Sequence, residues 1–295
     1  MPKPENVQYF YYALKIKAMK NILLPTDFSP FARSAAKAAA YIAKQTKATI
    51  HILHVVNAPS DWSWMPAASK QKHPHIEAQV SEAEATLKMM ATDKLFAGIK
   101  VKTHVTGGLI YDRITDFVTR NKVDLITIGA HGADEKDRQF IGSTTQRVIR
   151  LADCPVLSVK KNTEIKAIKK ILFTSNFEEN VSSAVNTVKD LAAKAKGEVD
   201  LLFINTPGNF VDTETAEKNM KKYMPKSGKV KFNDYTYNAF DLKKGVLNFM
   251  DRSKPDILAM VTHSRERQPA YHMSVTDSLL LHAKVPVLSI VLGKK

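Results

Sequence analysis

Apolar runs of strand length alternate with longer segments of helical period along most of the chain. The run ILLP at 22–25 precedes an Ala-rich segment over 30–44, and a second apolar run follows over 49–56. A nearly continuous apolar run predicts a strand that is covered on both faces. Strands that alternate with helices of ten or more residues are typical of βαβ units. The pattern therefore predicts an α/β fold with a parallel sheet.

The same order of segments occurs twice in the chain. Such an internal repeat indicates a duplication, in which each half forms a small open α/β domain of about five strands. The matched segments are 21–28 with 170–177, 30–44 with 179–194, 49–56 with 198–204, 123–126 with 255–258, and 154–159 with 285–290.

The repeat also predicts the domain boundaries. We expect a leader over residues 1–18, which has no counterpart in the second half, a first domain over 19–161 and a second over 168–295. The join at 160–169 is charged and has no Pro/Gly run. The two domains are therefore expected to pack closely rather than to move on a flexible tether.

An unmatched segment interrupts the first domain. Residues 58–75 contain Trp62, Trp64 and three prolines, and they precede a predicted helix over 76–95. A lid and an interaction surface are both open interpretations. We favour an ordered loop that is packed by its own tryptophans.

A glycine-rich loop follows a buried apolar run in the first half. Gly129, Gly132 and Gly142 precede Ser143 in the pattern G-x2-G-x9-G-S, and a helix begins near Ser143. Glycine allows positive φ and a close approach to a ligand, so that amide N–H groups can face phosphate oxygens. The helix N-terminus adds free N–H groups, and Ser143 and Thr145 add hydroxyl donors. The loop is a candidate polyphosphate site, with a simple tight turn as the alternative.

Residues of three predicted strands point to one place for a ligand. In open α/β sheets, ligands bind beyond the carboxyl ends of the strands, where the strand order reverses. Asp27, Val55 and Gly129 each lie at or just past the end of a predicted strand. We expect them to converge on one crevice.

Composition narrows the class of protein. The chain has 295 residues, 44% hydrophobic and 25% charged, which is ordinary for a globular protein. No apolar run reaches the roughly 18 residues that span a bilayer, and the first 20 residues show no secretory signal. The single cysteine, Cys154, fits a reducing compartment and is expected to be buried as a small apolar side chain. We expect a cytoplasmic protein without a membrane partner.

The net charge of +15 raises the question of a nucleic-acid partner. The lysines are dispersed, however, and aromatic residues do not interleave with them in a stacking pattern. We expect no nucleic-acid binding and interpret the charge as a solvated basic surface that favours anionic ligands.

Histidines offer no metal site. His51 and His54 lie in one predicted strand and are expected to pack, and His73 and His75 lie in the insert without a carboxylate or cysteine cluster.

Together these motifs resemble the universal stress protein family in its tandem two-domain form. The resemblance covers residues 19–292 and rests on ILLPTDFS at 22–29, LHV at 53–55, the loop at 129–143 and PVLSV at 155–159. It implies two tandem Rossmann-like domains of the adenine nucleotide alpha hydrolase type, each an open five-stranded parallel sheet.

The nucleotide-binding branch of that family implies an ATP site in the first domain, and Mg²⁺ stays open as a companion ion. Asp27 would face the adenine and ribose side, the backbone of Val55 would recognise the base, and the glycine loop would hold ribose and phosphates. Alternatives are Asp27 as a helix N-cap and His131 as a packed loop histidine. The residues that the resemblance implies in the site are Pro25, Thr26, Asp27, Val55, Ile128, Gly129, His131, Gly132, Gly142, Ser143, Thr144 and Thr145.

The second half departs from the nucleotide-binding pattern. Val and Met do not readily take positive φ or let a phosphate approach the backbone. We therefore expect one nucleotide per chain, with the second half empty of ATP or binding something else. The replacements are Asn176 for Asp27, Val261 for Gly129, Ser264 for Gly132 and Met273 for Gly142, whereas Ser274 matches Ser143.

The resemblance also implies how the halves meet. In the family the last strand commonly pairs with its copy in a partner subunit. Here the strands at 155–159 and 286–290 are expected to pair within one chain as a pseudo-dimer, and such pairing covers edges that would otherwise aggregate. A further homodimer is an additional expectation.

Binding is favoured over catalysis. The leading hypothesis is an ATP-binding regulatory module of the stress response. ATP hydrolysis ranks below binding because the Walker A pattern, a typical part of ATP-hydrolysing sites, is absent from the sequence. A slow ATPase or self-phosphorylating enzyme stays open as the second hypothesis. Asp134, Glu135 and Asp137 lie in the loop and could assist Mg²⁺, but we favour their interpretation as a solvated charged loop. A receptor for another adenine nucleotide, such as cyclic AMP, also stays open. A pure interaction module without a ligand is disfavoured by the intact glycine pattern.

Overall fold

The computed structural model describes residues 19–59, 61–62, 64–131, 141–225, 227–262 and 275–292. The leader at 1–18 therefore lies outside the described residues. So do Gly132 with the acidic residues Asp134, Glu135 and Asp137, and Ser264, Met273 and Ser274 of the second half.

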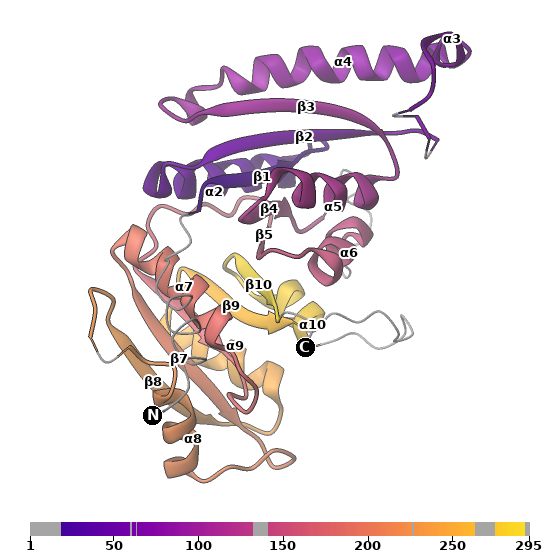
Figure 1. Cartoon of the computed structure of the whole chain (residues 1–295). Helices are drawn as coiled ribbons and strands as arrows, with labels where there is room; N and C mark the ends of the chain where they lie inside the picture. Colours follow the sequence, from indigo (N-terminus) through magenta and orange to yellow (C-terminus); the bar gives the residue numbers. More distant parts are fainter. Residues whose placement is uncertain are drawn as a thin grey trace, which may run out of the picture.

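The ten strands of the described residues form one sheet in the order β3-β2-β1-β4-β5-β10-β9-β6-β7-β8 (Figure 1). This confirms the predicted α/β fold with two five-stranded halves. The strands are β1 (Asn21–Pro25), β2 (Thr49–Asn57), β3 (Val101–Gly108), β4 (Leu125–Gly129), β5 (Val156–Val159), β6 (Lys170–Thr174), β7 (Glu198–Asn205), β8 (Phe232–Asn238), β9 (Ile257–Thr262) and β10 (Val287–Val291).

Within each half the strands are parallel, and the two halves meet at an antiparallel pair. Strand β5 pairs with β10, with Leu157 opposite Leu288 and Ser158 opposite Val287. The sheet is therefore continuous from one half into the other, and neither β5 nor β10 is left as an open edge.

Helices cover both faces of this sheet. Side chains of α2, α4, α7 and α8 pack on one face in a single hydrophobic core, and those of α5, α6, α9 and α10 pack on the other. Alternate residues of a strand point to opposite faces of the sheet, so there is one core on each face. Each core extends across both halves because the sheet is continuous. The helices are α2 (Pro30–Thr46), α3 (Ala67–Lys70), α4 (Pro74–Ala91), α5 (Ile110–Asn121), α6 (Ser143–Leu151), α7 (Ser182–Ala195), α8 (Thr213–Lys221), α9 (Leu242–Ser253) and α10 (Val275–His282), with a 3₁₀ turn η2 (Lys94–Phe96).

The first helices of the two halves end alike but begin differently. Both end at a lysine in the left-handed conformation, Lys47 after α2 and Lys196 after α7. Helix α2 begins at Pro30, as the sequence predicts, and its N-cap is Ser29. Helix α7 begins at Ser182 without a side-chain cap, so the predicted start at 179 is wrong by three residues.

Polar contacts join the two halves besides the strand pair. Arg150 Nη2 of α6 lies 2.9 Å from Asp277 Oδ2 of α10, and the Asp277 side chain is 5% exposed. Lys160 Nζ donates to the carbonyl oxygens of Leu281 and Ala283, where α10 ends. Backbone N–H of Ile168 donates to the Tyr41 hydroxyl at 3.1 Å. These contacts support the expectation of closely packed halves.

The insert in the first half packs partly on its own tryptophan. Trp62 is 5% exposed and forms a small cluster with Val56, Ala58 and Ile76, whereas Trp64 is 69% exposed. Helix α4 then runs along β3 at the edge of the sheet (Figure 1). The segment is thus an ordered loop over its described residues, as favoured from the sequence.

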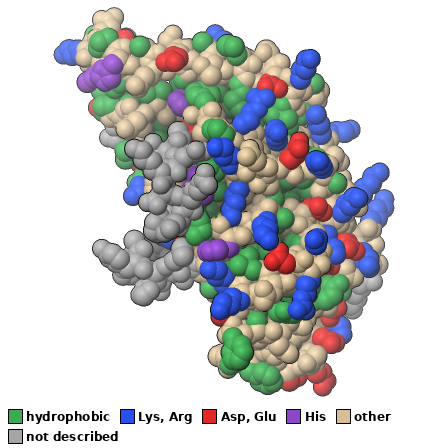
Figure 2. All heavy atoms as spheres, turned by 180° about the vertical axis from the view of Figure 1, so that it is seen from behind, with side chains coloured by type: hydrophobic (Ala, Val, Ile, Leu, Met, Phe, Trp, Pro, Cys, Tyr) green, Lys and Arg blue, Asp and Glu red, His purple; other side chains and the backbone are tan. Residues whose placement is uncertain are grey.

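The basic side chains are dispersed over the surface, as the sequence analysis expected. Figure 2 shows Lys and Arg side chains spread over one face, with Asp and Glu among them. Cys154 is buried, as expected. Of the helices that the structure describes, none has the length and apolarity to cross a membrane.

Candidate functional site

A cavity of about 370 Å³ opens beyond the carboxyl ends of β1, β2 and β4. This volume is within the range of small-molecule sites. It brings together every predicted site residue that the structure describes. The lining residues are Pro25, Thr26, Asp27, Ala32, Leu53, His54, Val55, Ile110, Ile114, Ile128, Gly129, His131, Gly142, Ser143, Thr144 and Thr145.

The turn after β1 presents Asp27 at the rim of this cavity. Phe28 adopts the left-handed conformation, with φ of 63°, and its N–H donates to Thr26 Oγ1 at 3.0 Å. Asp27 is exposed, and its Oδ1 accepts the Ser29 N–H at 3.0 Å. The N-cap of α2 is Ser29, whose Oγ accepts from Ala32 N–H at 3.2 Å. Asp27 is therefore not the cap of α2.

The backbone of Val55 faces the cavity because β1 is shorter than β2. Leu53 O accepts the Thr26 N–H at 2.9 Å, so the backbone of Leu53 points toward β1. Successive residues of a strand direct their backbone groups to opposite neighbours, which places Val55 on the same side as Leu53. Since β1 ends at Pro25, the N–H and C=O of Val55 face open space. This edge offers one donor and one acceptor to a ligand.

The N-terminus of α6 forms the opposite wall. Its N-cap Gly142 makes no side-chain cap hydrogen bond, and its first turn contains no acidic residue. The first N–H groups of a helix have no partner within it and carry the positive end of the dipole. Ser143 and Thr144 line the cavity at this end. The wall therefore suits an anion.

Thr145 has a different role from the one that we expected. It is 3% exposed, and its Oγ1 donates to Gly129 O at 2.8 Å. The hydroxyl proton holds α6 to the end of β4 and is not free for a phosphate.

Gly129 and Gly142 line the cavity, but neither uses the positive φ that the sequence analysis expected. Gly142 has φ of −53°, and Gly129 is absent from the described residues with positive φ. A Cβ on Gly129 would lie 2.9 Å from the carbonyl carbon of Phe31, at the start of α2. Gly129 is thus required by close packing of helix on strand rather than by its dihedral angles. Gly132 lies outside the described residues.

Two histidines complete the wall. His54 Nδ1 donates to Thr26 O at 2.8 Å, and its ring stacks on Phe28 with centroids 4.7 Å apart. The His131 ring lies 5.1 Å from that of Phe31. The sequence predicted a packing role for His54, and its position at the cavity was missed.

Helix α5 contributes side chains that the sequence analysis did not select. Ile110 and Ile114 line the cavity, with Ile110 41% exposed and Ile114 1% exposed. Their spacing of four residues places them on one face of the helix, which is the signal that identifies them.

The sequence model of the universal stress protein family matches residues 19–160. Universal stress protein MJ0531 of Methanocaldococcus jannaschii is 36% identical over 148 residues, which are 48% of this chain and 82% of that protein. The chain belongs to the universal stress protein family.

Other family members match both halves. Universal stress protein Slr1230 of Synechocystis is 26% identical over 299 residues, covering 92% of this chain and 99% of that one. The crystal structure of a universal stress protein from Archaeoglobus fulgidus superimposes with a TM-score of 0.75 over 93% of this chain and 99% of its own, at 18% identity. The fold of this family member therefore spans both halves.

Proposed function

We propose that this universal stress protein binds one ATP in the cavity of its first half and acts as a nucleotide-dependent regulatory module. The observation that carries the proposal is the N-terminus of α6, where the N-cap Gly142 makes no side-chain cap hydrogen bond and the first turn lines a cavity of about 370 Å³. Phosphate groups are favoured at such a terminus by free N–H groups and by the dipole. The net charge of +15 attracts an anionic nucleotide to the protein.

Each part of the nucleotide has a matching part of the wall. The phosphates would lie against the N–H groups of α6 near Ser143 and Thr144. The base would pair with the backbone edge of Val55, and the ribose hydroxyls would donate to the carboxylate of Asp27. Asp27 is the acidic side chain among the described lining residues, and Mg²⁺ would arrive with the triphosphate.

Two alternative functions use the same cavity. A slow ATPase or self-phosphorylating enzyme would need a residue that orients water or accepts the phosphoryl group. A receptor for cyclic AMP would use the base and ribose contacts with a single phosphate at α6. Binding of ATP is preferred because the first turn of α6 contains no acidic residue and the net charge is +15, both of which favour the more highly charged triphosphate.

We infer that the two halves, 19–161 and 168–295, act as the two members of a pseudo-dimer. The antiparallel pair of β5 and β10 supports this, because it relates the two halves within one sheet. Residues 1–18 are a leader in this proposal. A further homodimer of the whole chain remains a prediction.

The test is native mass spectrometry of the freshly purified chain, followed by extraction of nucleotide and titration with ATP. One ATP or ADP per chain is expected, and the proportion of ADP reports turnover. Ile110→Trp should fill the cavity and abolish binding, since Ile110 lies at the rim and is 41% exposed. Leu242→Trp at the matching position of the second half, 39% exposed, is the control and should bind ATP normally. The proposal is contradicted if the wild-type chain does not bind ATP, or if the Ile110→Trp variant binds ATP as tightly as the wild type does.

A further inference from the structure

A groove of about 290 Å³ opens beside the first cavity, between the end of β2 and helix α4. It shares His54 and Val55 with that cavity, so the two hollows are neighbours. Helix α4 has 18 residues, whereas α8, which follows the matching strand β7 in the second half, has nine.

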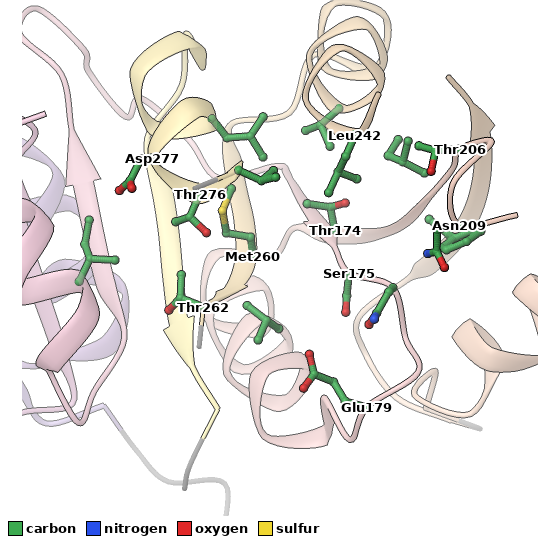
Figure 3. A pocket seen from close by; sticks show the side chains of 18 of the residues that line it. Thr174, Ser175, Glu179, Thr206, Asn209, Leu242, Met260, Thr262, Thr276 and Asp277 are labelled. Atoms are coloured by element: carbon green, nitrogen blue, oxygen red, sulfur yellow. The ribbon is translucent and has the colours of Figure 1, made fainter. Parts of the chain in front are cut away.

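The second half keeps a cavity of its own at the position that matches the first cavity (Figure 3). This cavity measures about 350 Å³, and none of its described lining residues belongs to α8. The groove is therefore built on an element that differs between the halves, and the proposed ATP site does not use it.

One wall of the groove is an aromatic stack. The rings of Phe28 and His54 have their centroids 4.7 Å apart and their planes 22° apart. His54 is held in this position because its Nδ1 donates to Thr26 O at 2.8 Å. Phe28 is 39% exposed and lines the groove. An accessible aromatic ring of this kind attracts a cation and covers the methylene groups that carry it.

The opposite wall presents oxygen acceptors along one face of α4. Gln79, Glu82 and Thr86 all line the groove. Their spacing of three and four residues places them one helical turn apart on the same face. Thr86 Oγ1 donates its proton to Glu82 O at 2.9 Å, so its lone pairs are left for a donor from a ligand. The wall therefore suits a ligand whose donors repeat at the length of one helical turn.

The groove carries negative charge in a chain whose net charge is +15. Glu82 is exposed, and none of the described lining residues is Lys or Arg. Asp27, next to Phe28 in the chain, adds a carboxylate at the rim of the neighbouring cavity. Charges farther away than about 8 Å are largely screened at physiological ionic strength. The groove therefore favours a cation although the chain as a whole is basic.

We propose that this groove binds an aliphatic polyamine. Amine nitrogens that are joined by three or four methylene groups lie about one helical turn apart in an extended chain, which matches the spacing of the acceptors on α4. The central ammonium group pairs with Glu82, and its neighbours donate to Gln79 and Thr86. The methylene groups pack on Phe28 and on Ala83, which is 4% exposed and lies between the acceptors. This inference is independent of whether the first cavity binds ATP.

The experiment titrates spermidine into the full chain carrying Ile110→Trp. The first cavity is filled in this variant, so spermidine cannot bind to a nucleotide there. Calorimetry and native mass spectrometry follow the binding, and one spermidine per chain is expected. Putrescine, which leaves one acceptor unused, should bind about tenfold more weakly. The uncharged 1,4-butanediol, which has the same length as putrescine, should not bind measurably at the same concentration.

Glu82→Gln tests the charged contact. It keeps the size of the side chain and should weaken spermidine binding by at least about tenfold, because the bond from an ammonium group to a carboxylate is charge-assisted. Glu84→Gln is the matched control, because Glu84 is also exposed on α4 but does not line the groove. It removes the same charge from the chain and should bind spermidine normally.

Phe28→Leu tests the aromatic wall. Loss of the ring should weaken spermidine binding by about threefold, as for a cation–π contact at an exposed site.

Three results overturn the proposal: no binding at millimolar spermidine, equal weakening in Glu82→Gln and Glu84→Gln, or binding of 1,4-butanediol as tight as that of putrescine. Equal weakening in the two glutamate variants would indicate diffuse attraction to the surface of α4 rather than a site. Failure of the wild-type chain to bind ATP would instead contradict the proposed function. Spermidine binding that persists in that case leaves the groove established as a site.

Discussion

At the residue scale, neighbouring polar side chains divide the work of folding and binding. Asp27 and Ser29 both lie in the turn between β1 and α2, yet only Ser29 caps the helix, through Ala32 N–H at 3.2 Å. Asp27 is exposed at the cavity rim, and among the described residues its carboxylate accepts the Ser29 N–H of its own turn. A stability measurement and a binding measurement should therefore separate the two residues.

We expect Ser29→Ala to lower the free energy of unfolding by about 1 kcal/mol, because the helix loses its N-cap. Asp27→Ala should change it by less than about 0.5 kcal/mol and weaken ATP binding by about tenfold, since hydrogen bonds to a charged group contribute more than neutral ones. Urea unfolding and ATP titration of both variants check this. A greater loss of stability in Asp27→Ala than in Ser29→Ala would contradict the assignment of the cap.

A second residue-scale prediction concerns a buried histidine pair at the other end of β2. His51 Nδ1 lies 3.1 Å from His104 Nε2, and His51 Nε2 lies 3.3 Å from Asn21 Oδ1. Burial, together with His104 and Lys102, lowers the pKa of His51 to about 4, and burial also lowers the pKa of His104. Because the folded pKa lies below the unfolded value, the unfolded chain binds protons more readily as the pH falls.

The contribution of His51 to stability is therefore complete above about pH 6.5 and is lost as the pH falls toward 4, by up to about 3 kcal/mol. Urea unfolding of the wild type and of His51→Leu between pH 7 and 4.5 measures it. The variant should be less stable at pH 7 and should lose less stability on acidification. Equal pH slopes in the two proteins would show that His51 is not the responsible group.

At the element scale, the start of a helix determines which residue the facing strand can carry. Gly129 at the end of β4 lies against the first residues of α2, and in the second half, where Val261 occupies the matching position, α7 starts three residues later than the position that matches Pro30. The glycine pattern was read from the sequence as a ligand contact. Its first member is explained by packing between elements, which a pattern within one segment does not reveal.

We expect Gly129→Val to destabilise the fold by about 1–3 kcal/mol through overpacking against α2. Val261→Ala should cost about 1–2 kcal/mol or less, because it removes methyl groups from a half-buried site without a clash. Thermal unfolding compares the two. Full stability of Gly129→Val would mean that α2 moves away without cost.

At the scale of the whole molecule, the two halves share one sheet and one core on each of its faces. Lys160 of the first half bonds to two carbonyl oxygens at the end of α10 in the second half, and burial lowers the pKa of Lys160. A cation at a helix C-terminus is favourable, and here it also joins the halves. The halves should therefore unfold together.

We expect Lys160→Met to destabilise the chain by about 2 kcal/mol, since two carbonyl oxygens lose a charged donor. Lys284→Met is the control, because the Lys284 side chain is 82% exposed and its pair with Asp251 is on the surface; a change within about 0.5 kcal/mol is expected. Calorimetry should show a single transition in both variants. Two separate transitions in the wild type would contradict the coupling of the halves.

The sequence alone predicted the repeat, the α/β fold and the strand ends that surround the first cavity, because these depend on local periodicity and on the geometry of parallel sheets. Asp27, Val55 and the start of α6 were all identified in this way. Only the tertiary structure showed that Thr145 bonds to Gly129, that Ile110 and Ile114 of α5 close the cavity, and that Ser29 rather than Asp27 caps α2. It also showed that the second half keeps a cavity whose wall includes Arg150 of the first. These features depend on which elements pack against one another, and contacts between residues distant in the chain leave no periodic signal along it.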